Sequence, residues 1–393
     1  MNLWLLNIGI ALVLSIYLTG FVIPKILTIA FSKNLFDVPN ERKIHTARVP
    51  RLGGLAFKPV IFFTLALIIG INISLGNEMF TLSFIKEIKP LSYFSCSIML
   101  LYLVGFGDDL VGIRYRIKFL AQFFCAALLI VGGLCITDLH GLFGIYSLNS
   151  WIAQPLTALL IVFIINSINF IDGIDGLASG LSSIILLFYG LTFFYFGLYM
   201  YALISFCTLG VLIPFYYYNV FGDANKQKKI FMGDTGSLTI GIILCALSLK
   251  LVQSIPDTDD ISYNPLVLVY SPFIIPCFDV IRVIFSRLRR GKNPFLPDKS
   301  HIHHKMLALG MNQHVAMATI ILTAILCTVG NILLSTHVTI TTLLTIDIVV
   351  WTLVNMLLSK IIKNKSAEAS IEKHSVKEII TIKYEKDKSI LFK

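Results

Sequence analysis

The chain has 393 residues, of which 56% are hydrophobic and only 14% are charged. Soluble domains usually contain about 45–50% apolar and about 25% charged residues, so this composition excludes an ordinary soluble enzyme and a generally disordered chain. The formal net charge is +10, but the apolar residues fall in long blocks, which are typical of membrane spans. The sequence therefore predicts a polytopic, all-α integral membrane protein, and it argues against nucleic acid as a partner.

Eleven apolar blocks are candidates for membrane-spanning helices, since a bilayer core about 30 Å thick needs about 20 helical residues per crossing. In chain order, the expected spans are 3–24, 54–75, 91–107, 118–136, 151–171, 179–197, 199–220, 235–252, 264–285, 315–334 and 337–358. They define an expected transmembrane domain of residues 1–362. The polar, lysine-rich residues 363–393 are expected to form a cytoplasmic tail.

The distribution of lysine and arginine predicts the orientation of these spans. If the N-terminus lies outside, 29 lysines and arginines fall on the cytoplasmic side and only three on the other side. Positive charge is concentrated in cytoplasmic loops, so the C-terminus is expected in the cytoplasm. No basic segment precedes the first span, which is therefore interpreted as an uncleaved anchor.

With this topology, acidic residues far apart in the sequence gather on the cytoplasmic face. Carboxylates at a membrane boundary are costly unless a cation compensates them. The adjacent pair Asp108 and Asp109 closes the third span, with Lys118 following nine residues later. Two adjacent carboxylates repel each other, and Mg²⁺ typically binds carboxylate oxygens together with substrate phosphates. A pair of solvated loop acids is the alternative explanation.

Two glycine- and aspartate-rich segments follow. Asn166, Asn169, Asp172 and Asp175 are spaced by three, which predicts that all four share one helical face. Because a polar stripe facing lipid would be costly, it is expected to face a wet cleft, or else to form a polar helix–helix contact. The segment 233–237 places Asp234 in a Gly-Asp-Thr-Gly-Ser turn that opens a helix. Such a turn can bind an anion or can serve as an ordinary helix cap.

The longest cytoplasmic loop carries three histidines within four residues, His301, His303 and His304, and Arg287 precedes them. Three histidines can indicate zinc, but the basic neighbours and the lack of cysteine on this face favour phosphate binding. A purely structural cluster is the alternative.

Two further acids lie inside spans. Asp279, three residues before Arg282, is expected to form an internal ion pair near the cytoplasmic end. Asp347 lies in the middle of the last span and is a functional candidate by its position. A structural hydrogen bond to a neighbouring helix is the expectation here, since nothing else marks this residue.

Taken together, these segments resemble the polyprenyl-phosphate N-acetylhexosamine-1-phosphate transferase family, over roughly residues 35–310. Five motifs match in order and on one membrane face. They are Asp37-x-Pro39-Asn40-x-Arg42-Lys43-x-His45 with Pro50-Arg51-x-Gly53-Gly54, then Gly107-Asp108-Asp109, Asn169-Phe-x-Asp172-Gly-x-Asp175-Gly, Gly233-Asp234-Thr-Gly-Ser, and Pro297-Asp298-x-x-His301-x-His303-His304. The histidine motif resembles the N-acetylglucosamine branch more than the peptidoglycan branch.

The resemblance implies transfer of an N-acetylhexosamine-1-phosphate from a UDP-sugar to undecaprenyl phosphate, with release of UMP, as the initiating step of a cell-surface glycan of the O-antigen, teichoic acid or capsule type. UDP-GlcNAc is the first expectation for the donor, and another UDP-N-acetylhexosamine is the alternative. The resemblance also implies a Mg²⁺ cofactor with Mn²⁺ as a substitute, membrane lipid and a homodimer as partners, and an active site on the cytoplasmic face of the bacterial inner membrane. It leaves open whether the lipid phosphate attacks directly or an aspartate forms a covalent intermediate.

The resemblance assigns roles residue by residue. Asp175 and Asp234 are expected to bind Mg²⁺, whereas Asp108 and Asp109 act near the lipid phosphate and Lys118 holds a phosphate. The nucleotide-sugar pocket is expected to include Asn169, Asp172, Asn219 and Arg287. The catalytic residues of the cytoplasmic loop are expected to be Asp298, His301, His303 and His304. The first basic loop is expected to add Lys43 and His45.

Two other classes were weighed. A CDP-alcohol phosphotransferase has a similar Asp-Gly-rich signature, but that signature continues with Ala-Arg, whereas here Ala178 is followed by Ser179. A transporter would place charged residues near the membrane midplane, and only Asp347 is clearly deep in this chain.

Overall fold

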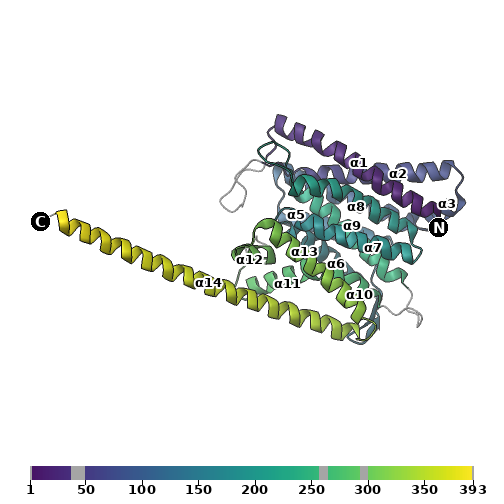
Figure 1. Ribbon diagram of the computed structural model, residues 1–393. Coiled ribbons are helices and arrows are strands. Elements are labelled where there is room, and N and C mark those ends of the chain that lie inside the picture. Colours follow the sequence, from purple (N-terminus) through teal and green to yellow (C-terminus); the bar gives the residue numbers. More distant parts are fainter. Residues whose placement is uncertain (1, 37–48, 256–263, 293–299, 392–393) are drawn as a thin grey trace.

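The computed structural model describes residues 2–36, 49–255, 264–292 and 300–391, with side chains described as far as Lys365. Nearly all of this chain is helical, which confirms the all-α class. The helices run back and forth along one bundle axis (Figure 1). The long helices are α1 (Asn2–Ser32), α2 (Phe57–Ser74), α4 (Ile88–Val111), α6 (Ser150–Ile171), α7 (Leu177–Tyr195), α8 (Tyr199–Val220), α9 (Gly233–Ser254), α13 (Gln313–Leu334) and α14 (Ile340–Leu391).

Shorter elements connect these helices. They are the 3-10 turns η1 (Gly53–Ala56) and η2 (Ser271–Phe273), the helices α3 (Glu78–Lys86), α5 (Tyr115–Val131), α10 (Pro265–Tyr270), α11 (Ile274–Leu288) and α12 (Ile302–Ala308), and the strands β1 (Asp138–Leu142) and β2 (Ile145–Ser147). The two strands form an antiparallel hairpin that the sequence did not predict. Positive φ angles at Gly141 and Gly144 allow its tight turn.

Ten helical segments of the described chain are long and apolar enough to cross a membrane, and they correspond to ten of the eleven expected spans. The remaining expected span is α5, whose 17 residues extend about 26 Å at the usual rise per residue. It packs between α4 and α6. In Figure 1 the N-terminus and the C-terminus lie at opposite ends of the bundle, as an odd number of passages requires. Which end faces the cytoplasm stays a prediction.

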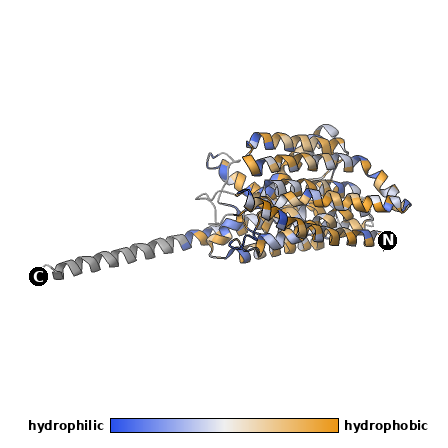
Figure 2. Cartoon of the chain, turned by 90° about the horizontal axis from the view of Figure 1, so that it is seen from above, coloured by the Kyte–Doolittle hydropathy of each residue, from blue (hydrophilic) through white to orange (hydrophobic). Residues whose placement is uncertain are grey.

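Local sequence explains where several helices begin. The asparagine side chains at 77, 149, 264 and 312 each accept a hydrogen bond from a backbone N–H of the first turn that follows. Asparagine is one of the preferred residues at this position, because its side chain satisfies an N–H group that has no partner within the helix. Apolar side chains then dominate the length of the bundle, and hydrophilic residues are more frequent toward its ends (Figure 2).

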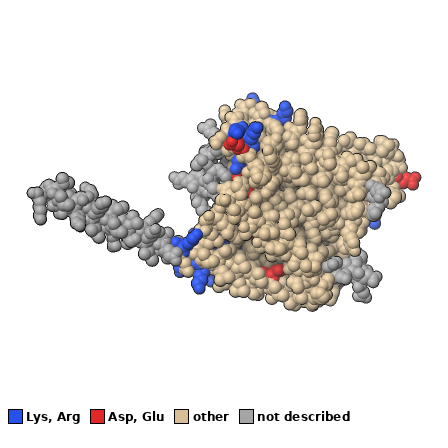
Figure 3. Space-filling view, in the orientation of Figure 1, with Lys and Arg blue, Asp and Glu red and all other residues tan. Residues whose placement is uncertain are grey.

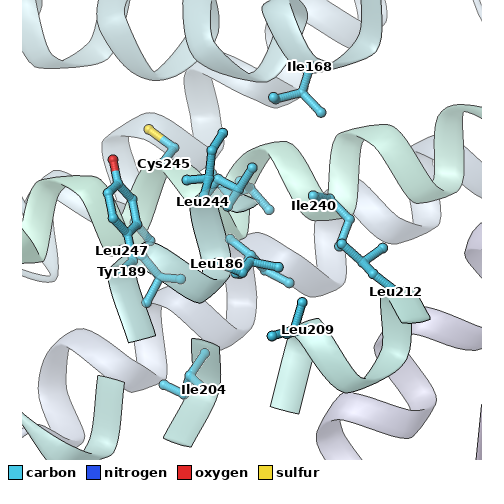
Figure 4. Packing of buried hydrophobic residues seen from close by; sticks show 14 of the residues in the cluster. Ile168, Leu186, Tyr189, Ile204, Leu209, Leu212, Ile240, Leu244, Cys245 and Leu247 are labelled. Atoms are coloured by element: carbon cyan, nitrogen blue, oxygen red, sulfur yellow. The ribbon is translucent and has the colours of Figure 1, made fainter. Parts of the chain in front are cut away.

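Helix α9 is the centre of the bundle, and nearly all of its membrane-length segment is buried. It contacts α4, α6 and α7 along its length. Figure 4 shows how apolar side chains of these central helices meet. The labelled residues come from α6 (Ile168), α7 (Leu186, Tyr189), α8 (Ile204, Leu209, Leu212) and α9 (Ile240, Leu244, Cys245, Leu247). This packing holds both ends of α9 in fixed positions, including the end that carries Asp234.

Charged surface gathers toward the ends of the bundle, and the face between them is almost entirely uncharged (Figure 3). Helix α14 continues without a break through the expected domain boundary after residue 362, so a single helix joins the bundle to the lysine-rich segment. The division into residues 1–362 and 363–393 therefore has no counterpart in a helix end, and it stays a prediction.

Candidate active site

The first turn of α9 is held by a carboxylate from another helix. The backbone N–H groups of Asp234 and Thr235 donate to the two oxygens of Asp109, at 2.8 and 2.9 Å, and the Thr235 hydroxyl donates to Asp109 at 2.5 Å. A helix N-terminus carries partial positive charge and N–H groups without partners, so it favours an anion. The expected anion-binding turn is thus present, and its anion is Asp109 of α4.

Close backbone contacts surround the same turn, and glycines make them possible. A Cβ atom at Gly54 would collide with the backbone of Gly236, and one at Gly105 would collide with the backbone of Thr235. Gly233 has a positive φ of 70°, which L side chains rarely adopt. The N–H groups of Gly53 and Gly54 also donate to the carbonyls of residues 231 and 232, both at 2.9 Å. These contacts fix the backbone that carries Asp234.

Lys118 links the two acidic motifs. Its ammonium group donates to Asp108 at 2.6 Å and also to Asp234. Asp108 additionally accepts from the backbone N–H of Ile113 at 2.6 Å. Asp108, Lys118 and Asp234 come from three different helices, α4, α5 and α9. Their convergence brings together three expected site residues that are up to 126 positions apart in the sequence.

Asn169, near the end of α6, joins this group. Its side-chain amide donates to Asp234 at 3.2 Å and to the Ser237 hydroxyl at 2.7 Å. The side-chain amide of Asn166, one turn earlier, instead donates to Gln122 of α5 at 2.6 Å. This is a polar helix–helix contact, the alternative explanation for the Asn166–Asp175 stripe. The helical stripe therefore divides between a structural contact and the site.

The expectation that Asp172 and Asp175 continue this helical face is wrong. Helix α6 ends at Ile171, and both aspartates lie in the loop before α7. Gly176 has a positive φ of 77°, which places the chain in a left-handed conformation and prevents the helix from continuing. Asp172 nevertheless lies close enough to Asp234, Asp175 and Asp109 for their negative charges to raise its pKa.

Asp175 and Asn219 are tied to the loop before α9. The Asp175 carboxylate is buried and pairs with the Lys229 ammonium at 2.7 Å. Asn219, at the end of α8, accepts from the backbone N–H of Gly176 at 2.6 Å and donates to the carbonyl of Ile230 at 2.9 Å. The side chain of Asn219 thus joins the two loops, and its expected contact with the nucleotide stays a prediction.

Asp172 lies in the loop between α6 and α7 and is exposed to solvent. Among the described residues, none forms an ion pair or hydrogen bond with the Asp172 carboxylate. Protein atoms packed around its carboxylate nevertheless displace part of its water. This loss of water raises its pKa to about 7, helped by the negative charge of Asp234 and opposed by the guanidinium of Arg51. A cation placed here would restore the ionised form.

The three histidines lie beside the same loop in three different environments. His301 Nδ1 is 2.8 Å from a carboxylate oxygen of Asp279 in α11. The ring of His303 is stacked parallel to that of His301, with centroids 5.8 Å apart, and it presses on Gly173, where any Cβ would collide with it. His304 lies next to His303, with ring centroids 4.3 Å apart. The histidine motif and the Asp172–Asp175 loop are therefore in direct contact.

His303 is the most deeply buried of the three histidines, and its expected contact with the donor stays a prediction. Burial lowers its pKa to about 3, and the neighbouring charges of His304 and His301 act in the same direction. Its side chain is almost fully buried, so the neutral ring serves as a spacer between His301 and the loop at Gly173.

Helix α12, which begins within the histidine motif, is fastened to α14. The Lys305 ammonium donates to the side-chain oxygens of Asn355 and Ser359, both at 3.0 Å. Lys365 donates to the carbonyl of Leu309 at 2.8 Å, just after α12 ends. Helix α14 thus contacts α12 and the residue that follows it, next to the histidine motif.

The two intramembrane acids behave as expected. Asp279 pairs with Arg282 at 2.8 Å. Asp347 accepts from the Tyr270 hydroxyl at 2.9 Å and from the Asn331 amide at 2.8 Å, so it bonds two neighbouring helical segments. Among the remaining expected site residues, Arg287 is buried near the end of α11, whereas Lys43, His45 and Asp298 lie outside the described residues.

The acidic side chains of the site suit Mg²⁺ better than a metal whose ligands all come from the protein. Among the residues that the structure describes, no three acidic, histidine or cysteine side chains are grouped to hold a metal by themselves. Mg²⁺ commonly takes one or two carboxylates and completes its shell with phosphates and water. The field of neighbouring carboxylates around Asp172 fits such an ion. The predicted ligands Asp175 and Asp234 each contact a lysine here, and their metal role stays a prediction.

Sequence reasoning assigned no role to several residues that build this site, although two of them, Arg51 and Thr235, lie within the quoted motifs. Lys229 pairs with Asp175, Thr235 helps to hold Asp109, and Arg51 acts on Asp172. A signal for Lys229 was present, since it lies five residues before Asp234 in the same loop. No sequence signal joins Asp109 to the backbone of the α9 turn, because that pairing depends on how α4 packs against α9.

Comparison with known proteins agrees with this geometry. The glycosyl transferase family 4 profile matches residues 91–252. A probable undecaprenyl-phosphate N-acetylglucosaminyl 1-phosphate transferase of Bacillus subtilis is 30% identical, with 84% of this chain and 86% of that protein covered. Undecaprenyl-phosphate alpha-N-acetylglucosaminyl 1-phosphate transferases of Salmonella typhi and Pasteurella multocida are 32% and 30% identical, covering 77% and 78% of this chain and 77% and 80% of those proteins.

The fold, the site and these relatives define a multi-pass membrane enzyme, a glycosyl-1-phosphate transferase. The chain belongs to the polyprenyl-phosphate N-acetylhexosamine-1-phosphate transferase family, as its motifs indicated.

Proposed function

We propose that this enzyme transfers GlcNAc-1-phosphate from UDP-GlcNAc to undecaprenyl phosphate. An oxygen of the lipid phosphate attacks the sugar-linked phosphorus, the bond from that phosphorus to UMP breaks, and undecaprenyl-pyrophosphoryl-GlcNAc remains. The names of the three relatives above specify undecaprenyl phosphate and an N-acetylglucosaminyl 1-phosphate group. The UDP carrier is inferred from the motifs.

One observation carries the proposal most directly, namely the Asp108–Lys118–Asp234 group at the end of the bundle. Phosphoryl transfer requires in-line positioning and neutralisation of negative charge more than it requires covalent chemistry. An embedded lipid phosphate and a water-soluble nucleotide can meet only where the membrane core ends. The close set of carboxylates and ammonium groups lies near the ends of the membrane-length helices α4 and α9, which supports this site for the transfer.

Different residues of the site are assigned phosphate binding, metal binding and positioning. Lys118 and Lys229 are the cations that exchange a carboxylate partner for a substrate phosphate. Asp172, Asp175 and Asp234 would hold Mg²⁺, which when bound supplies charge neutralisation to the pyrophosphate of the donor. Asn169 keeps Asp234 oriented through its 3.2 Å hydrogen bond.

The geometry around Asp109 supports direct attack by the lipid phosphate. Both oxygens of Asp109 already accept hydrogen bonds from the first turn of α9. Using this carboxylate as a nucleophile would break the contacts that position Asp234. Asp108 has one oxygen toward Lys118 and is the better placed acid to receive a proton from the lipid phosphate.

The positive-inside rule supports an active site on the cytoplasmic face of the bacterial inner membrane, with UDP-GlcNAc arriving from the cytoplasm and undecaprenyl phosphate from the bilayer. The product would begin a cell-surface glycan of the O-antigen, teichoic acid or capsule type. Association into a homodimer and a separate role for residues 363–393 stay predictions.

The proposal is tested by UMP release from UDP-GlcNAc with undecaprenyl phosphate and Mg²⁺, measured on purified wild type and on Asp234→Asn. The variant is expected to lose UMP release while its melting profile in detergent stays that of a folded protein. Asp223→Asn is the matched control, because Asp223 is an exposed acid in the loop before α9, 4.0 Å from Lys226. Wild-type turnover in Asp234→Asn would refute the metal assignment.

A further inference from the structure

The buried carboxylate of Asp279 organises the start of the histidine motif. One oxygen accepts from His301 Nδ1 at 2.8 Å. The other oxygen accepts from Arg282 at 2.8 Å and from the backbone N–H of Ile302 at 3.1 Å. Arg282 also donates to the carbonyl of Ser300. Three consecutive residues, 300–302, are thus tied to one turn of α11.

Asp279 itself cannot reach a substrate, because its side chain is 0% exposed. A buried carboxylate is costly unless charge and hydrogen bonds compensate it. Arg282 supplies the opposite charge, and the other donors occupy the remaining oxygen sites. The carboxylate is therefore satisfied within the protein, and any effect on the reaction must pass through the groups that it holds.

His301 is the one of these groups that lies beside the site. Its ring packs next to Phe170, the residue that follows Asn169, with centroids 6.3 Å apart. The His301 ring also stacks with that of His303, which presses on Gly173 next to Asp172. Within the described part of the chain, Nδ1 is the only nitrogen of His301 that forms a hydrogen bond. Nε2 is therefore the nitrogen left for a ligand.

We propose that Asp279 is a positioning residue for the transfer reaction, and that it holds His301 so that Nε2 meets an oxygen of the donor pyrophosphate. This inference rests on the proposed function. A histidine that carries a proton on each ring nitrogen can donate from Nδ1 to the carboxylate and from Nε2 to a phosphate oxygen, and the Asp279 contact fixes which nitrogen points away from α11. His301 and His303 then differ in role: His301 contacts the donor, and His303 packs between His301 and the loop at Gly173.

The size of the effect follows from comparable arrangements. Mutation of a carboxylate that orients a functional histidine typically lowers activity or affinity by about 10- to 100-fold. Replacing Asp279 by Asn keeps the size of the side chain but removes the charge and allows the amide to face His301 with its NH₂ group. We expect kcat/KM for UMP release to fall by about 10- to 100-fold in Asp279→Asn.

A double-mutant cycle separates this positioning role from a general structural one. His301→Gln removes the group through which Asp279 is proposed to act. The double variant Asp279→Asn/His301→Gln should therefore be no less active than His301→Gln alone, within about threefold. If Asp279→Asn lowers kcat/KM by the same factor in both backgrounds, Asp279 does not act through His301 and the inference is overturned.

Two controls accompany the cycle. His337→Gln makes the same replacement at an exposed histidine between α13 and α14, away from the site, and it should retain wild-type turnover. Melting profiles in detergent identify any variant that fails to fold. If wild type releases no UMP with any donor, the proposed function fails, and the orientation of His301 is then judged by the next measurement.

That measurement needs no activity. Nitrogen-15 NMR of histidine-labelled full-length protein in detergent should contain a strongly hydrogen-bonded Nδ1–H signal. The signal should vanish in His301→Gln, shift in Asp279→Asn and remain unchanged in His337→Gln. A His301 signal that is identical in wild type and in Asp279→Asn would contradict the proposed contact.

Discussion

Replacing Asp109 should damage stability and activity together, because its carboxylate holds the first turn of α9. Asp109 accepts two backbone hydrogen bonds, at 2.8 and 2.9 Å, and one from the Thr235 hydroxyl at 2.5 Å. In Asp109→Ala these donors lose their acceptor beside the buried α9 turn. The turn that carries Asp234 then loses its anchor, and UMP release should fall with it.

The magnitude follows from those three contacts. Each buried donor left unsatisfied costs about 1–3 kcal/mol, and a lost helix cap typically costs about 0.5–2 kcal/mol. Since water and the Thr235 hydroxyl can recover part of this, we expect Asp109→Ala to lower the free energy of unfolding by about 2–5 kcal/mol. Thr235→Val removes only the hydroxyl contact, so it should cost about 1 kcal/mol and retain most of the activity.

The assay is reversible unfolding in mixed detergent micelles, with UMP release measured on the same preparations. Asp109→Asn, which keeps one acceptor oxygen, should fall between wild type and Asp109→Ala in stability. An Asp109→Ala protein as stable as wild type but inactive would show that Asp109 acts in the chemistry itself. That result would refute the capping argument.

The remaining predictions concern Lys118, the histidine motif and Asp347. Lys118→Met should lower turnover but tighten Mg²⁺ binding to the substrate-free enzyme by calorimetry, since its ammonium no longer competes for Asp234; unchanged Mg²⁺ affinity would contradict this. Gly173→Ala should lower activity at least about tenfold, because its Cβ collides with His303, and normal turnover would argue against that packing. Because the His303 pKa is about 3 in the folded protein and about 6.5 when unfolded, its contribution to stability is complete above pH 6.5 and declines as the pH falls toward 3. Between pH 7 and pH 5, the free energy of unfolding should therefore fall by up to about 2 kcal/mol less in His303→Gln than in wild type. An equal fall in both proteins would exclude a neutral buried ring. Asp347→Asn should retain substantial activity, because its carboxylate contacts only Tyr270 and Asn331; complete inactivity in a stable protein would give Asp347 a functional role.

Much of the fold was predictable because lipid imposes strong constraints on sequence. A span must be apolar over about 20 residues and must satisfy its own backbone hydrogen bonds, so the blocks in the sequence located the helices. Helix ends were less predictable. Asp108 and Asp109 were expected after the third span, but α4 continues through them to Val111, because polar residues at the end of a span do not by themselves stop a helix.

The candidate site was predictable as a set of residues but not as a set of contacts. Asp108, Lys118, Asn169 and Asp234 were expected together, and the structure brings them together. Their pairings depend on tertiary packing. The approach of Gly54 to Gly236, for example, sets where α9 begins relative to its neighbours.

The Asp172–Asp175 loop shows the limit of periodicity. A spacing of three predicts one helical face only while the helix continues, and glycines at 173 and 176 end it. The sequence contained that signal, since two glycines followed the two aspartates, but the contact between Gly173 and His303 joins segments that lie 130 residues apart.

The central claim is tested most directly by incubating the purified protein with undecaprenyl phosphate, Mg²⁺ and a panel of UDP-sugars, and by measuring UMP and the lipid product. The account predicts UMP release that requires the lipid and Mg²⁺, with UDP-GlcNAc as the preferred donor, and undecaprenyl-pyrophosphoryl-GlcNAc in equal amount. Folded protein that forms no lipid-linked sugar from any donor in the panel would contradict it.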